Sequence, residues 1–266
     1  MPLIDLRRAR EESRQFGSRE VDALQPLRWL ALGWRDLLDC PVPGLVHGAA
    51  IAAFGALLLA LAHDRFWLLA GAFSGFLIVA PILATGLYRV SSELERGRRT
   101  TLRETLAVWV PHDGRLVVFG LLLGLAGTGW VMTSASLVTG FSSVPGTRPV
   151  EFIRHVVLDE SPWLFAAWLA LGGVLAAPVF ASCVVALPLL LDTRSGVLGA
   201  VLTSWRVVLR NPVPLALWAA LLLALTLAGM AGALVGLVVV VPWLAHASWH
   251  AYRELVGPEG SAAQAG

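Results

Sequence analysis

The chain has 266 residues, of which 57% are hydrophobic and only 14% are charged, with a mean hydropathy of +0.72. This composition excludes an ordinary soluble domain and indicates an integral membrane protein. The formal net charge is only +2, but all 20 basic residues are arginine, so their positions carry more information than their sum.

The two ends of the chain differ from the apolar part between them. Residues 1–25 contain five arginines and lack the apolar core that a cleavable secretory signal needs. We therefore expect them to form a basic, flexible cytoplasmic tail, and we expect residues 255–266 to form a flexible C-terminal tail. Residues 26–254 then make up the polytopic membrane domain.

Six stretches are long and apolar enough to cross the hydrocarbon core, which takes about 20 helical residues. In chain order they are Gly44–Ala62, Phe66–Tyr88, Leu116–Val138, Pro162–Leu191, Val213–Gly229 and Ala231–Tyr252. The last two form one unbroken apolar run, which we divide near Gly229–Gly232 because it is about twice as long as one crossing.

Arginine placement predicts the orientation of these spans. All but three of the arginines lie before the first span, in residues 89–115 and 192–212, or at the C-terminus. The exceptions are Arg65, Arg148 and Arg154. Because arginine-rich loops stay in the cytoplasm, we expect a multi-pass protein of the bacterial inner membrane with both termini cytoplasmic.

The sequence also repeats itself. The segment WRDLLDCPVPGL from Trp34 matches WRVVLRNPVPLA from Trp205, and a proline lies within the second span of each predicted pair of spans. We interpret this pattern as three parallel hairpin repeats in an all-α membrane protein. The repeats cover residues of about 26–95, 100–192 and 197–254.

A cytoplasmic amphipathic helix is expected before each hairpin. Apolar residues recur at helical spacing from Leu27 to Leu38 and again from Leu198 to Leu209. The middle copy is shorter and opens with Thr101 three residues before Glu104, a pattern typical of a capping box. Arginine and tryptophan on such helices suit the headgroup region of a bilayer.

Three prolines interrupt the second helices of the hairpins, at Pro81, Pro178 and Pro242. A proline inside a helix removes a backbone hydrogen bond and bends the helix. Each site is either a hinge next to a substrate site or a fixed kink that lets the hairpins pack. Their repetition in all three units favours the fixed kink.

Ionisable and aromatic residues gather where the spans meet the cytoplasm. His246 and His250 are one helical turn apart, and we group them with other residues in a candidate polar cluster. Its further members are His47, Tyr88, Asp192 and Arg253.

Three interpretations of the cluster remain open: structural residues at the interface, proton or ligand handling, and a metal or haem site. For a metal the candidates are His246 and His250, and two ligands fall short of the three or four that a site needs. Cys40 and Cys183 fit reduced structural thiols. No cofactor is predicted.

The cytoplasmic arginines predict contact with anionic lipid. The segment LERGRRTTLR, residues 94–103, and the N-terminal tail should be attracted to anionic headgroups. Acidic residues are interleaved with these arginines, which argues against nucleic acid as a partner. Common nucleotide-binding and hydrolase motifs are missing, and this weakens an enzymatic function without excluding it.

Several blocks together resemble a bacterial family known only as predicted integral membrane proteins with a domain of unknown function. The blocks are PLRWLALGWRDL (26–37), SGFLIVAPILATGLY (74–88), LPLLLD (187–192), SWRVVLRNPVP (204–214) and HASWHAYR (246–253). The resemblance extends over residues of about 26–254. It implies a polytopic inner-membrane protein and supplies no catalytic residues.

Three functions follow as hypotheses. The leading one is a non-catalytic accessory, assembly or scaffold subunit of a larger membrane complex or of a self-associated form, because glycine-rich apolar faces suit helix packing. The alternative is a transporter or small-ligand carrier that uses the polar cluster. The third is a haem or metal protein based on His246 and His250.

Overall fold

The computed structural model describes residues 6–62, 83–107, 114–141 and 163–258, and most of them are helical. The helices are α1 (Leu6–Arg14), α2 (Gln25–Asp39), α3 (Pro41–Ala62), α5 (Leu102–Ala107), α6 (Gly114–Phe141), α8 (Trp163–Cys183), α9 (Ala186–Asp192), α10 (Val197–Arg210), α11 (Pro212–Ala231) and α12 (Leu237–Leu255). Residues 83–95 are helical as well. Two short strands, β1 (Phe16–Ser18) and β2 (Val256–Pro258), form an antiparallel pair.

Four described helical stretches are long and apolar enough to cross a membrane. They are Pro41–Leu61, Gly114–Phe141, Trp163–Asp192 and Pro212–Ala231. These correspond to the first, third, fourth and fifth predicted spans, whereas most of the second lies outside the described residues. The chain therefore contains several helices that are apolar and long enough to span a bilayer.

The sixth predicted span differs from helix α12. The helix begins at Leu237 rather than Ala231, after a turn that separates it from α11. It is not among the four spanning candidates, because its second half carries two histidines, Arg253 and Glu254, which lower its mean hydropathy. Much of this half is buried in protein: Ala247, Trp249, Ala251 and Leu255 are almost inaccessible to solvent.

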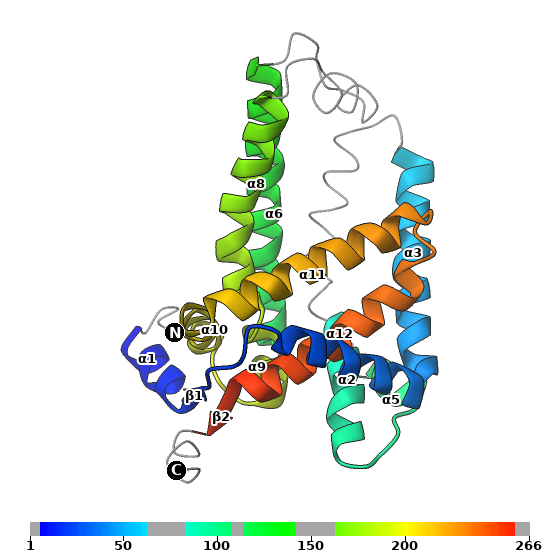
Figure 1. Ribbon diagram of the computed structural model, residues 1–266, viewed down its shortest axis with the longest axis vertical. Coiled ribbons are helices and arrows are strands. Elements are labelled where there is room, and N and C mark those ends of the chain that lie inside the picture. The colour runs from blue at the N-terminus through cyan, green and yellow to red at the C-terminus, as the bar shows by residue number, and fades with distance from the viewer. Residues whose placement is uncertain (1–5, 63–82, 108–113, 142–162, 259–266) are drawn as a thin grey trace.

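The helices fall into two zones in Figure 1. Helices α6 and α8 stand side by side, α3 runs along the other side of the molecule, and α11 crosses obliquely between them. At the lower end, α1, α2, α9, α10, the C-terminal half of α12 and both strands come together. We call this second zone the basal layer. Two of the three helices that we expected to be amphipathic, α2 and α10, lie in it.

The junctions α2–α3 and α10–α11 have nearly the same local geometry. Cys40 has φ −139° and ψ 68°, and Asn211 has φ −126° and ψ 53°. A proline follows each of them and begins the next helix, a position where the missing N–H costs nothing. The two aligned sequence segments thus fold alike here. The middle counterpart lies outside the described residues, so the threefold repeat stays a prediction.

Helix α12 is held by close contacts at two glycines. A Cβ atom on Gly33 of α2 would lie 2.4 Å from the backbone nitrogen of Ala247. A Cβ atom on Gly48 of α3 would lie 2.1 Å from the carbonyl oxygen of Val238. Only glycine permits helix backbones to approach this closely. The two contacts fix α12 against both α2 and α3.

The main hydrophobic core lies around the basal layer and joins it to the spans. Trp29 of α2 and Trp218 of α11 are fully buried, and their rings meet edge to face with centroids 5.7 Å apart. The indole N–H of Trp29 donates to the Glu254 carboxylate at 2.7 Å, which satisfies the polar edge of the ring.

The N-terminal segment is ordered where we expected a flexible tail. Strand β1 pairs with β2, so Ser18 lies opposite Val256, and part of the expected C-terminal tail is ordered too. The side chain of Asn211 accepts a hydrogen bond from the Val21 backbone N–H at 3.0 Å. Residues 259–266 lie outside the described part of the chain.

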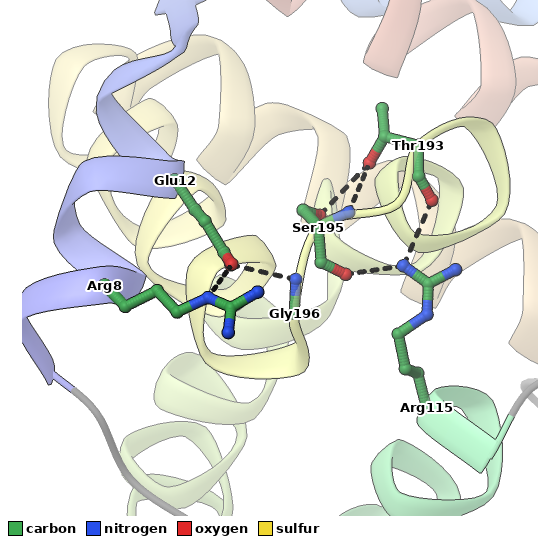
Figure 2. Close-up of polar contacts among 6 residues, drawn as sticks. All are labelled: Arg8, Glu12, Arg115, Thr193, Ser195 and Gly196. Atoms are coloured by element: carbon green, nitrogen blue, oxygen red, sulfur yellow. Dashed lines mark hydrogen bonds and ion pairs between the residues drawn. The ribbon is translucent and has the colours of Figure 1, made fainter.

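Helix α1 docks on α10 through a carboxylate. Figure 2 shows Glu12 accepting the Gly196 backbone N–H, at 2.9 Å, at the start of α10. The negative charge also suits the positive end of the helix dipole. Arg8 pairs with the same carboxylate at 3.1 Å. The amphipathic N-terminal segment therefore has a specific docking site.

At the turn between α9 and α10, Arg115 connects α6 to the end of α9. Its guanidinium donates to the carbonyl oxygens of Leu190, Thr193 and Ser195 (the last two are drawn in Figure 2). Leu190 lies in the last turn of α9, and Thr193 and Ser195 follow it, so these carbonyls lack partners within the helix. One arginine thus caps the fourth span and fixes the first turn of α6.

Candidate functional site

The second half of α12 carries the two histidines that we singled out, and both face protein. His250 donates through Nε2 to a carboxylate oxygen of Asp36 on α2, at 2.8 Å. The two side chains are only 14% and 12% exposed. This hydrogen bond joins α12 to α2 and fixes the orientation of the His250 ring.

His246 lies one turn earlier and is fully buried. Its Nδ1 atom is 2.8 Å from Oγ of Ser91, which belongs to the helix at residues 83–95. Its Nε2 atom has no hydrogen-bond partner among the described residues. That atom faces Gly44 of α3, where an added Cβ would lie 3.6 Å away. The ring therefore occupies the space that glycine leaves open.

His47 lies on α3, one turn after Gly44, and is also buried. Its Nδ1–H donates to the carbonyl oxygen of Pro43 at 2.7 Å. This bond assigns the proton to Nδ1 in the neutral ring, so Nε2 is the acceptor nitrogen. The structure places His47, His246 and His250 in the region where α2, α3 and α12 meet.

The remaining predicted residues form a second group. Asp192, at the end of α9, accepts a hydrogen bond from the Tyr252 hydroxyl at 2.8 Å. Arg253 lies 3.8 Å from the same carboxylate and 3.2 Å from Glu95. Tyr88 packs in the hydrophobic core beside Trp249, with ring centroids 6.4 Å apart. The predicted cluster is thus divided into a histidine group and an Asp192–Arg253 group.

Sequence reasoning did not identify Asp36 or Ser91, the partners of the two histidines. Asp36 falls beside the apolar stripe of α2, on the side where sequence alone suggests contact with water. It is buried because α12 covers that side of the helix at Gly33. No local pattern distinguishes such a carboxylate from a solvated one.

A metal site needs three or four ligand side chains held close together. Within residues 6–62, 83–107, 114–141 and 163–258, no group of three or more His, Cys, Asp and Glu side chains is arranged to hold an ion. Cys40 donates its thiol to the Thr100 carbonyl oxygen at 3.3 Å. The histidine group therefore has the geometry of a hydrogen-bonded junction between helices.

Two of the three predicted helix-breaking prolines can be placed. Pro178 lies inside α8 and Pro242 inside α12, whereas Pro81 lies outside the described residues. The Cβ of Pro242 is 3.1 Å from where a Cβ on Gly44 would lie, so it packs closely on α3. This contact favours a role in packing for Pro242.

Comparison with known families adds one finding. Residues 68–192 match the family model described as a predicted integral membrane protein (DUF2189). The match covers slightly less than half of the chain. The resemblance inferred from the sequence is confirmed over this segment, which includes the blocks at residues 74–88 and 187–192. The blocks at residues 26–37, 204–214 and 246–253 lie outside it.

No curated protein and no solved structure matches the chain. The DUF2189 segment and the four apolar helices together identify an integral membrane protein. The family is of unknown function, so a role for the protein has to be argued from its own surfaces.

Proposed function

We propose that this protein is a non-catalytic accessory or scaffold subunit that associates with other membrane helices through one face of α6. The face consists of Gly129, Thr133, Ser136 and Gly140, spaced four, three and four residues apart, and we call it the α6 stripe. This spacing aligns the four residues along one side of a helix. The stripe is the observation that supports the proposal.

Among the residues that the structure describes, no side chain covers the glycines of the stripe. A Cβ atom on Gly129 or on Gly140 would have no neighbour within 4 Å among the described residues. Thr133 and Ser136 are exposed. Small residues on a membrane helix allow another helix to approach closely, which strengthens van der Waals packing in lipid.

The hydroxyl groups of the stripe are satisfied within the helix. Thr133 donates to the Gly129 carbonyl oxygen at 2.7 Å, and Ser136 donates to that of Met132 at 2.9 Å. Such bonds let the hydroxyls face lipid without an unpaired donor. The same groups can also bond across to a neighbouring helix, so the surface is compatible with both a free and a bound state.

A different face of α6 is already occupied by α8. Trp168 donates its indole N–H to the Ser134 hydroxyl at 2.6 Å, and Gly172 gives space to the Trp130 ring. At Gly172 the missing side chain lets a residue of the other helix pack closely. We propose that the glycines of the stripe do the same for another helix. The stripe is thus a second packing surface of the same kind.

The alternative function, transport or carriage of a small ligand, has less support. In the four described spans the charged side chains are Arg115 and Asp192, and both lie near span ends. Transporters usually carry polar or broken helices near the membrane midplane. The histidine group lies beside the basal layer, where it joins helices, and this position also favours a structural role.

The architecture that accompanies the proposal has six spans in three parallel hairpin repeats in a bacterial inner membrane. The basal layer would face the cytoplasm together with both termini. The positions of α1 and β2 in this layer support the orientation (Figure 1), as do the exposed arginines of residues 94–103. The orientation is tested by placing single cysteines in the loops and measuring whether a membrane-impermeant reagent labels them in intact spheroplasts.

The test of function is extraction in a mild detergent or polymer, followed by sizing and mass spectrometry of the particle. We expect wild type to migrate as an assembly with itself or with another membrane protein. The double variant Gly129→Leu/Gly140→Leu should release a monomer because leucine side chains separate the helices. Gly173→Leu is the matched control, since Gly173 on α8 is equally open.

Two results would contradict the proposal. One is a wild-type protein that is monomeric and alone under the mildest extraction. The other is an assembly that survives both leucines of the double variant. If Gly173→Leu disrupts the assembly as much as the double variant does, the association surface is not the α6 stripe.

A further inference from the structure

An open cleft of about 490 Å³ lies between the helix at residues 83–95 and helix α5. The polar residues that line it are Arg89, Glu93, Arg98, Arg99, Thr100 and Glu104. We call it the arginine cleft. Leu191, at the end of the fourth span, contributes an apolar wall.

One carboxylate serves three guanidinium groups beside this cleft. Glu93 pairs with Arg89 at 2.8 Å, with Arg96 at 2.9 Å, and with Arg98. A single negative charge cannot neutralise three positive ones, so the local charge stays positive. Each guanidinium has five N–H donors, and most of them are not used by Glu93.

Glu93 keeps its charge in this setting. Desolvation alone would raise the pKa of its carboxyl, but the charges and hydrogen bonds of Arg89, Arg98 and Arg96 together lower it below the ordinary value. The carboxylate therefore holds the arginines in place across the neutral range. It acts as a fixed anchor for the cationic wall of the cleft.

The second acid in the cleft is already engaged elsewhere. Glu104 accepts hydrogen bonds from the Thr101 backbone N–H at 2.8 Å and from the Thr101 hydroxyl at 2.9 Å, which confirms the predicted capping box. Arg99, by contrast, is exposed and makes no hydrogen bond or ion pair with the described residues. It is available to an incoming anion.

We propose that the arginine cleft binds a phosphate group, either that of an anionic lipid headgroup or a free phosphate. Guanidinium groups present paired N–H donors that match phosphate oxygens in a bidentate geometry. The volume leaves room for a headgroup around the phosphate, and the wall at Leu191 suits an adjoining acyl chain. This site does not depend on the α6 stripe.

The experiment uses the full chain and compares Arg99→Gln with Arg103→Gln. Both variants remove one exposed arginine, but only Arg99 lines the cleft. Thermal unfolding in chloride alone first establishes that each variant folds like wild type. Binding is then measured with inorganic phosphate, against chloride at matched ionic strength, and in nanodiscs of phosphatidylcholine with and without phosphatidylglycerol.

We expect Arg99→Gln to weaken binding by about fivefold, the effect of one arginine near an anionic surface, while Arg103→Gln stays near wild type. Binding of both probes, or of inorganic phosphate alone, assigns the cleft to soluble phosphate groups. Binding of phosphatidylglycerol alone assigns it to lipid. Equal losses in the two variants, or no loss with either probe, would overturn the proposal.

Discussion

Substitution of Gly48 by alanine tests the contact that holds α12 against α3. The added Cβ would lie 2.1 Å from the Val238 carbonyl oxygen, well inside the ordinary contact distance of about 3.4 Å. The clashing atom belongs to the backbone, so no side-chain rotation can relieve it and the helices must separate. Overpacking of this kind costs about 1–3 kcal/mol. The better helix propensity of alanine offsets up to about 1 kcal/mol of this cost.

We therefore expect Gly48→Ala to lower stability by up to about 2 kcal/mol. Thermal unfolding in a mild detergent, followed by tryptophan fluorescence, reports the change because Trp249 lies in α12. The control is Gly173→Ala, where a Cβ meets no described atom within 4 Å. It should be neutral or slightly stabilising. If Gly48→Ala melts at or above the wild-type temperature, the close approach of α12 to α3 is wrong.

Three further changes test the ion pairs of Glu93 and two polar contacts of the basal layer. The folded-state pKa of Glu93 is lowered. The ionised carboxylate therefore stabilises the fold fully above the ordinary glutamate pKa of about 4.3, and this stabilisation is lost as pH falls through the lowered pKa. Melting curves of Glu93→Gln should therefore depend less on pH in this acid range than those of wild type. Glu12→Ala should cost about 1 kcal/mol and speed amide exchange in α1, since the N-terminus of α10 loses its cap. Asp36→Leu leaves His250 without its buried partner and should lower stability by about 1–3 kcal/mol in the same melts, whereas Asp36→Asn should lower it less.

The four spans that the structure describes could be predicted from apolar length. The expected span Gly44–Ala62 became Pro41–Ala62, and Leu116–Val138 became Gly114–Phe141. Hydrocarbon thickness sets a minimum length, and a proline at a helix start marks the boundary, so both signals are local. Apolar length did not locate the start of α12, because Ala231 and Leu237 belong to one unbroken apolar run.

The order in the N-terminal segment could not be predicted for a different reason. Strand β1 pairs with β2, and these strands lie at opposite ends of the chain. Each is three residues long and has no alternating pattern of its own. The docking of Glu12 on the first turn of α10 depends on the same long-range arrangement. Local composition showed only a polar, arginine-rich segment.

Only the spacing of the histidines, and not their partners, could be predicted from the sequence. The spacing of His246 and His250 places both on one side of a helix, and this much is local. Their partners depend on which helices lie against α12, and the glycines that decide it belong to α2 and α3. His250 meets Asp36 because α2 and α12 touch at Gly33, and His246 fits beside α3 at Gly44. Each histidine therefore lies at a contact between helices, and its polar partner depends on that contact.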